Sequence, residues 1–273
     1  MTIHERVVAH LDHALGRASR VIEPFSHVYL ENVFPTDTYR EILDHLPDLP
    51  LFSPDNPKKY RGAVAKLAGG ERSGVQPRSI ASDTSARMAD AHDLESCRYV
   101  LPLNAANLER MPAADRPVWR GLADALCSPQ LKNRVFELFA DDLCRRLRIT
   151  RGALGRVRAY PRPSLIRDFA GYWIAPHPDT GAKLVTMQLY LPRDKSQQAL
   201  GTTLYRRRLF NPRNLLSVKN MFEKVVQLPF LPNSGYAFPV GAHSWHGRDE
   251  VPQSCGERNS ILLFYYRDGS REW

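Results

Sequence analysis

Residues 171–192, GYWIAPHPDTGAKLVTMQLYLP, contain two short runs of aromatic and aliphatic side chains separated by a turn. The runs YWIAPH and KLVTMQLYLP have the length and composition of strands, and PDTGA supplies the turn residues. His177 and Asp179 lie two residues apart at the end of the first run. Two ionisable side chains at the mouth of a buried strand are costly in free energy unless they bind something. The stretch therefore indicates a β-rich fold with a ligand at this strand end.

The same pattern of short apolar runs separated by turn residues continues through the C-terminal half of the chain, after Gly152. Short runs of Val, Leu, Tyr and Phe alternate there with turn residues, and little room remains for helices between them. This spacing predicts an antiparallel barrel or sandwich. The expected strands are GRVRAYPR, YWIAPH, KLVTMQLYLP, GTTLYRRR, EKVVQLPF, GYAFPV, SWHGRDE and RNSILLFYYR.

The N-terminal half has the 3.6-residue periodicity of helices instead. We expect helices at 3–18, after Pro35, and at 82–93, 116–127 and 129–147. Residues 51–77 are rich in Pro, Gly, Lys and Arg, and they predict a long surface loop that is either a lid or disordered. The fold class is therefore α+β with a mainly β core. We expect a single domain over 1–273, with residues 1–150 as mainly helical support and residues 151–273 as the core.

The composition of the 273 residues is that of a globular protein, with 43% hydrophobic and 25% charged side chains. A net charge of +9 favours anionic partners, which include small carboxylates, phosphates and nucleic acid. The four cysteines show no CxxC pair, which predicts a reduced, cytoplasmic protein. The first twenty residues carry charges throughout and do not resemble a signal peptide, and no apolar run is long enough to span a membrane.

His177 and Asp179 are candidates for metal ligands because side chains at positions i and i+2 of a strand point to the same face. The other HxD triplet, His10 to Asp12, falls in an expected helix, where residues two apart point away from each other. A third ligand is available in GAHSWHGRDE, where we prefer His246 over His243 because it comes at the start of an expected strand. Two histidines and one carboxylate suit Fe(II) better than a closed zinc site.

A second pair of candidate binding residues follows 12 residues after His246. Arg258 and Ser260 lie there on the same face of an expected strand. A guanidinium fork and a hydroxyl side by side are suited to binding one carboxylate. A dicarboxylate that chelates the metal at one end and binds Arg258 at the other would explain both placements.

The motifs HPD at 177–179, WHG at 245–247 and RNS at 258–260 together resemble the Fe(II)/2-oxoglutarate-dependent dioxygenase superfamily, over about residues 155–267. The resemblance implies a double-stranded β-helix (jelly-roll) core and an iron bound by His177, Asp179 and His246. It also implies that Arg258 and Ser260 bind the distal carboxylate of 2-oxoglutarate. The implied reaction uses O2, releases succinate and CO2, and hydroxylates a substrate; desaturation or ring formation are alternatives. A carboxylate at position 179 argues against the related halogenases.

Several other residues are weaker candidates. Thr186 and Gln188 alternate with Val185 and Met187 along KLVTMQLYLP, so one face of this expected strand is polar. That face would contact 2-oxoglutarate if it lies in the core, and solvent if it lies at the surface. Candidates for binding substrate are Arg162, Arg167, Tyr172 and Arg206, against the alternatives of surface charge and aromatic packing. They favour a small anionic substrate such as an amino acid derivative.

Two other functions remain open at this point. One is an oxygenase of the same superfamily that modifies a protein side chain or alkylated nucleic acid, although the basic residues are scattered rather than interleaved with stacking aromatics. The other is a non-catalytic β-barrel binding module that bears a metal. Arg258 and Ser260 argue against the second, because a structural metal needs no dicarboxylate clamp.

Overall fold

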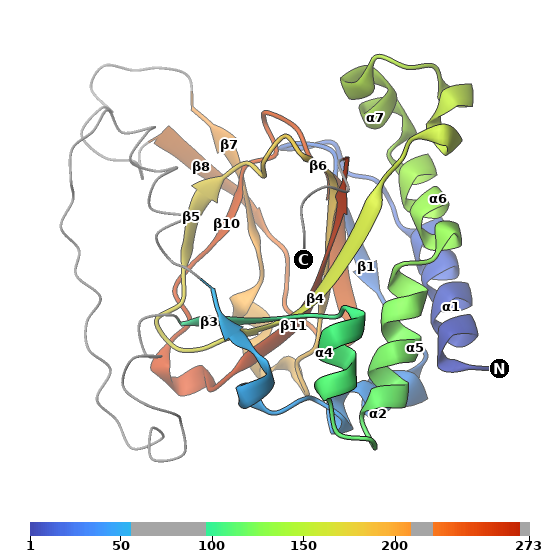
Figure 1. Ribbon diagram of the computed structural model, residues 1–273. Helices are drawn as coiled ribbons and strands as arrows, with labels where there is room; N and C mark the ends of the chain where they lie inside the picture. The colour runs from blue at the N-terminus through green and yellow to red at the C-terminus, as the bar shows by residue number, and fades with distance from the viewer. Residues whose placement is uncertain (56–96, 209–220, 268–273) are drawn as a thin grey trace.

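Two antiparallel sheets face each other in the computed structural model, which describes residues 1–55, 97–208 and 221–267 (Figure 1). The larger sheet has the strand order β1-β9-β6-β11-β4-β3-β2, and the smaller one β5-β10-β7-β8. The strands are β1 (Val28–Glu31), β2 (Ser53–Pro54), β3 (Arg98–Pro102), β4 (Tyr160–Asp168), β5 (Ile174–His177), β6 (Lys183–Tyr190), β7 (Thr203–Arg207), β8 (Phe222–Gln227), β9 (Ser234–Pro239), β10 (His246–Arg248) and β11 (Arg258–Tyr266).

The connections between β4 and β11 identify the fold. The chain alternates between the two sheets from β4 to β7, forms a hairpin from β7 to β8, and alternates again to β11. As a result the last strand, β11, lies between β4 and β6, and β10 lies between β5 and β7. Eight strands wound in this order form a double-stranded β-helix, the jelly-roll arrangement expected for the C-terminal half.

The helices cover the outer face of the larger sheet (Figure 1). They are α1 (Ile3–Arg17), α2 (Thr36–Asp44), α4 (Ala105–Arg110), α5 (Arg116–Leu126), α6 (Pro129–Leu138) and α7 (Ala140–Leu147). Thr2 and Glu5 form a capping box at the start of α1, and Val7, Leu11 and Leu15 form its buried stripe. The helices and the sheet share one apolar core, to which β11 contributes Ile261, Leu263 and Tyr265.

A second core fills the space between the two sheets and is largely aromatic, with Tyr190, Phe230, Tyr236 and Phe238 at its centre. Strand β6 is buried on both faces, because the helices lie on one side of it and this inner core on the other. Its alternate side chains therefore divide between an apolar outer layer and a mixed inner layer, in which Thr186 and Gln188 are buried polar residues.

The N-terminal half contributes three short strands in addition to its helices. Strands β1, β2 and β3 extend the larger sheet at both of its edges. The expected strand GRVRAYPR begins only at Tyr160 and continues to Asp168. The single helix expected over 129–147 is two helices, because Phe139 leaves helical geometry (φ −108°, ψ 25°) while its side chain is fully buried.

Two expectations fall outside the described residues, wholly or in part. The helix predicted at 82–93 does so entirely, and so does the predicted surface loop from residue 56 onwards. In the part of the chain that the structure describes, no helix combines the length and the apolar character needed to cross a bilayer.

Candidate metal centre

The pairing of β5 with β10 brings two of the predicted ligands together. His177, the last residue of β5, lies directly opposite His246, the first residue of β10, and their ring centroids are 4.4 Å apart. Asp179 follows two residues after β5, and its Oδ2 lies 3.8 Å from Nε2 of His246. One ligand atom from each of the three residues can be chosen so that all lie within 4.8 Å of one another.

Gly247 allows this close approach of β5 and β10. A Cβ at position 247 would lie 2.7 Å from the carbonyl oxygen of Ile174 and 3.0 Å from the carbonyl carbon of Ala175, both of which are backbone atoms. Any larger residue would therefore force the two strands apart where they carry His177 and His246.

Both imidazole rings are oriented by the backbone. Nδ1 of His177 lies 2.9 Å from the carbonyl oxygen of Ala175, and Nδ1 of His246 lies 3.0 Å from that of Ser244. A hydrogen bond from Nδ1 to a carbonyl leaves Nε2 as the atom that can bind a metal. Burial, together with the neighbouring His246, lowers the pKa of His177 to about 3, and burial likewise lowers the pKa of His246. Both rings are therefore neutral at neutral pH, as metal ligands must be.

Asp179 is buried but ionised. Burial alone would raise the pKa of its carboxyl, but the ammonium of Lys183 and the nearby imidazoles outweigh burial and hold the pKa below its usual range. Nζ of Lys183 lies 2.5 Å from Oδ1, and the hydroxyl of Thr186 donates a 2.6 Å hydrogen bond to Oδ2. The carboxylate is thus fixed from β6, in the larger sheet.

The donor set fits a divalent transition metal. Bonds of about 2.1 Å place two ligand atoms on one ion no more than about 4.2 Å apart, and the separation of 3.8 Å between Asp179 and His246 already meets that limit. Two imidazoles and one carboxylate on one side of an ion form the facial triad of non-haem Fe(II) oxygenases. The described residues thus combine a double-stranded β-helix with a candidate triad of two histidines and one aspartate, as the motif resemblance implies.

A band of polar side chains continues from the triad along the inner face of the larger sheet. Gln188 lies two residues after Thr186 on β6, and its Nε2 donates a 2.8 Å hydrogen bond to the hydroxyl of Ser260. Its Oε1 accepts a 2.9 Å hydrogen bond from Tyr236. Ser260 in turn lies two residues from Arg258 on β11, so the band connects Asp179 with Arg258 through residues on one face of the larger sheet.

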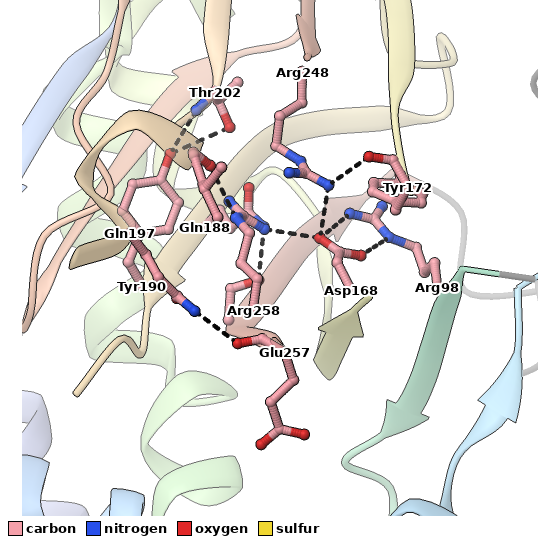
Figure 2. Close-up of polar contacts among 12 residues, drawn as sticks. Arg98, Asp168, Tyr172, Gln188, Tyr190, Gln197, Thr202, Arg248, Glu257 and Arg258 are labelled. Carbon is pink, nitrogen blue, oxygen red and sulfur yellow. Dashed lines mark hydrogen bonds and ion pairs between the residues drawn. The ribbon is translucent and has the colours of Figure 1, made fainter. Parts of the chain in front are cut away.

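Arg258 is completely buried at the far end of this band (Figure 2). Its Nε donates a 2.9 Å hydrogen bond to the carbonyl of Leu200, and its Nη1 donates a 2.8 Å hydrogen bond to Oδ2 of Asp168 on β4. Its Nη2 is buried and has no hydrogen-bond partner among the described residues. One arm of the fork therefore remains available for a ligand.

Two further arginines meet Asp168 from other strands, as Figure 2 shows. Arg98 of β3 holds both carboxylate oxygens, at 2.6 and 3.0 Å. Arg248 of β10 lies 3.6 Å from Oδ2 and donates a 3.2 Å hydrogen bond to the carbonyl of Tyr172. Burial alone would raise the pKa of Asp168, but the three guanidinium groups outweigh it and lower the pKa. A single ionised carboxylate thus faces three buried or nearly buried cations.

The remaining predicted site residues lie in different environments. Tyr172 is buried beneath the guanidinium groups of Arg98 and Arg248, at 4.0 and 4.8 Å from its ring centre. The register of β4 and β11 sets Arg162 opposite Phe264, with its guanidinium 5.0 Å from the ring centre of Tyr266.

The other three candidates are not brought to the triad. Arg167 points to the outer face of β4, where it binds Asn259 and the carbonyl of Pro47. Arg206 is exposed and forms an ion pair with Glu23. His243, the alternative third ligand, is exposed in the turn before β10.

Sequence reasoning missed four residues of this interior: Lys183, Asp168, Arg98 and Arg248. A signal existed for Arg248, because it follows His246 by two residues on the same expected strand and therefore shares its face. A signal also existed for Asp168, since an acid within an apolar strand is rarely buried without a partner. Nothing local marks Arg98, because β3 joins β4 across a large separation in sequence.

No protein-family model matches the chain, and neither does any curated protein. Among solved structures, a Pseudomonas putida prolyl-4-hydroxylase is similar over 96% of this chain and 100% of its own, at 12% identity and a TM-score of 0.42. The non-haem α-ketoglutarate-dependent epimerase SnoN from nogalamycin biosynthesis is similar over 97% of this chain and 86% of its own, at 13% identity and a TM-score of 0.43. AviO1 from Streptomyces viridochromogenes is similar over 96% of this chain and 97% of its own, at 13% identity and a TM-score of 0.45.

Proposed function

We propose that this chain is an Fe(II)- and 2-oxoglutarate-dependent hydroxylase that acts on a small anionic metabolite such as an amino acid derivative. The observation that carries the proposal is the placement of the triad and Arg258 at opposite ends of one polar band inside the barrel. A dicarboxylate that binds the metal at one end and a guanidinium at the other matches this arrangement.

Each residue of the band has a definite role under this proposal. His177 and His246 bind the metal through Nε2, and Asp179 binds it through a carboxylate that Lys183 and Thr186 hold in place. Iron, 2-oxoglutarate and dioxygen bound there would supply the oxidation, with succinate and CO2 as the products of the co-substrate.

The far end of the band binds and shields the co-substrate. Arg258 binds its distal carboxylate through the free arm of the fork, and Ser260 and Gln188 line the path between the two ends. The aromatic inner core, with Tyr190, Phe230 and Phe238 fully buried, excludes water from the space between the sheets.

Support for an anionic substrate comes from the net charge of +9 and from Arg162, which the register places on the inward-facing set of β4 residues. Arg206 and Arg167 give no such support, since both already have acidic or carbonyl partners away from the triad.

The test is an anaerobic titration of the metal-free protein with Fe(II) and then 2-oxoglutarate, with detection of the visible charge-transfer band of the chelate. We expect a band in the unaltered protein and in the matched control His243→Ala, and none in His246→Ala. Absence of the band in folded, unaltered protein would contradict the proposal. Release of succinate with a panel of anionic metabolites then identifies the substrate class.

A further inference from the structure

The charge of the Arg98–Asp168–Arg248–Arg258 cluster (the arginine cluster) is not balanced by the described residues. Asp168 is the only described carboxylate that forms an ion pair with Arg248 or Arg258, and both reach the same oxygen, Oδ2. Arg98 occupies that carboxylate in a bidentate fashion. Among the residues that the structure describes, Arg248 and Arg258 therefore share one carboxylate that Arg98 already binds.

The unused donors lie on two of these side chains. Nε and Nη1 of Arg248 and Nη2 of Arg258 are buried and have no hydrogen-bond partner among the residues the structure describes. The side chains of Arg248 and Arg258 are 3% and 1% exposed, so bulk water does not solvate their charges. Buried charged donors without partners are costly in free energy, and an incoming anion would satisfy them.

The two arginines come from facing sheets. Arg248 belongs to β10 of the smaller sheet, two residues from His246, while Arg258 belongs to β11 of the larger sheet, two residues from Ser260. Their convergence on one oxygen of Asp168 shows that both forks reach the same point between the sheets (Figure 2).

We propose that Arg248 is a second carboxylate-binding residue, which grips the distal carboxylate of the dicarboxylate co-substrate together with Arg258. The inference rests on the proposed function for the identity of the ligand. It adds a residue outside the RNS motif and makes both sheets part of carboxylate recognition. Asp168 and Arg98 then act as the fixed support that holds the two forks in position.

The test compares two ligands that differ only at the distal end. 2-Oxopentanoate has the carbon chain of 2-oxoglutarate with a methyl group in place of the distal carboxylate. Binding of each is measured by calorimetry on Mn(II)-loaded protein, for the unaltered chain, for Arg248→Met and Arg248→Lys, and for Arg156→Gln as an exposed arginine control.

We expect Arg248→Met to weaken binding of 2-oxoglutarate by about tenfold or more, the size of a lost charge-assisted hydrogen bond. Binding of 2-oxopentanoate should change by less than about twofold, because that ligand has no carboxylate at the far end. Arg248→Lys keeps the charge but loses the fork, so its affinity for 2-oxoglutarate should lie between that of the unaltered protein and that of Arg248→Met. Arg156→Gln should bind both ligands as the unaltered protein does.

If Arg248→Met loses affinity equally for the two ligands, or loses none for either, the inference is overturned and Arg248 is a purely structural member of the arginine cluster. If Arg248→Met does not fold, the ratio of the two affinities in Arg248→Lys decides the question. Failure of the proposed function is recognised separately, by the absence of Mn(II) binding at the triad in electron paramagnetic resonance. The same pair of ligands titrated into metal-free protein then still reports on Arg248.

Discussion

Asp179 and Asp168 are two buried carboxylates that remain ionised for different reasons. Asp179 has one ammonium neighbour, Lys183, and a hydrogen bond from Thr186, and it keeps one side toward the two imidazoles. Asp168 is surrounded by guanidinium groups from three strands. The first environment leaves room for an added cation, whereas the second already contains more positive charge than one carboxylate can balance.

Replacement of Asp168 by Asn tests how much of the fold depends on this carboxylate. The amide removes the negative charge and leaves three guanidinium groups facing one another in a buried space. We expect Asp168→Asn to lower the free energy of unfolding at pH 7 by about 3 kcal/mol or more, as for other broken buried ion pairs. Urea denaturation measures it, and a loss below about 1 kcal/mol would show that the arginine cluster needs no internal counter-ion.

The same residue should give the protein an acid-dependent stability. The pKa of Asp168 is lowered from its ordinary value of 3.8, so the folded state binds its proton less readily than the unfolded state. The stabilisation is fully present above about pH 4 and is lost as the pH falls through the folded pKa. Unfolding free energies measured between pH 5 and 2 should therefore fall less steeply in Asp168→Asn than in the unaltered protein.

At the scale of elements, β10 is only three residues long, yet it carries His246, Gly247 and Arg248. It contributes a metal ligand, a close backbone approach and a guanidinium in consecutive positions. Its partners β5 and β7 hold it on both sides, so the position of the metal ligand depends on the spacing of these strands.

Gly247→Ala should disturb this spacing. The added methyl group would meet backbone atoms of Ile174 and Ala175, which cannot rotate away as a side chain can. We expect a loss of about 1–3 kcal/mol of stability and a weaker affinity for Mn(II), because His177 and His246 are drawn apart. Gly155→Ala, where a Cβ would meet nothing within 4 Å, is the matched control. Unchanged metal affinity in Gly247→Ala would show that the two strands can separate without moving the ligands.

The strands of the barrel were predictable because period-two patterning and turn residues are local signals. The double-stranded β-helix and the choice of His246 beside His177 and Asp179 were implied by the family resemblance that the order HxD, His, RxS carries. The arginine cluster was not predictable in the same way, because Arg98 of β3 meets Asp168 of β4 across 70 residues of sequence and no nearby residue signals the pairing. Asp168 was overlooked beside Arg167, which faces the opposite layer because adjacent strand residues alternate between the two faces.

At the scale of the whole molecule, the metal triad connects the two sheets. His177 and His246 belong to the smaller sheet, while Asp179 is tied to β6 of the larger sheet through Thr186 and Lys183. The second tie between the sheets is Asp168 with its arginines. Two separate groups of polar residues, the triad and the arginine cluster, thus join the two sheets, and an aromatic core fills the space around them.

A bound ion should therefore stabilise the fold as a whole. We expect Mn(II) at a hundredfold excess over its dissociation constant to raise the free energy of unfolding by about 2.7 kcal/mol, through binding to the folded state alone. The increase should vanish in His246→Ala and persist in His243→Ala, as measured by urea denaturation with and without the ion. A similar increase in both variants would place the stabilising ion elsewhere on the protein.

The side chains of strand β11 form two alternating sets that face different layers of the protein. Its odd-numbered members Ile261, Leu263 and Tyr265 are anchored in the helical layer, while Arg258 and Ser260 face the space between the sheets. Under the proposed function, whether a position in β11 is odd or even decides whether its substitution alters stability or ligand binding. Evolution can accordingly change ligand binding through the even-numbered positions of β11 while the odd-numbered positions keep the strand packed against the helices.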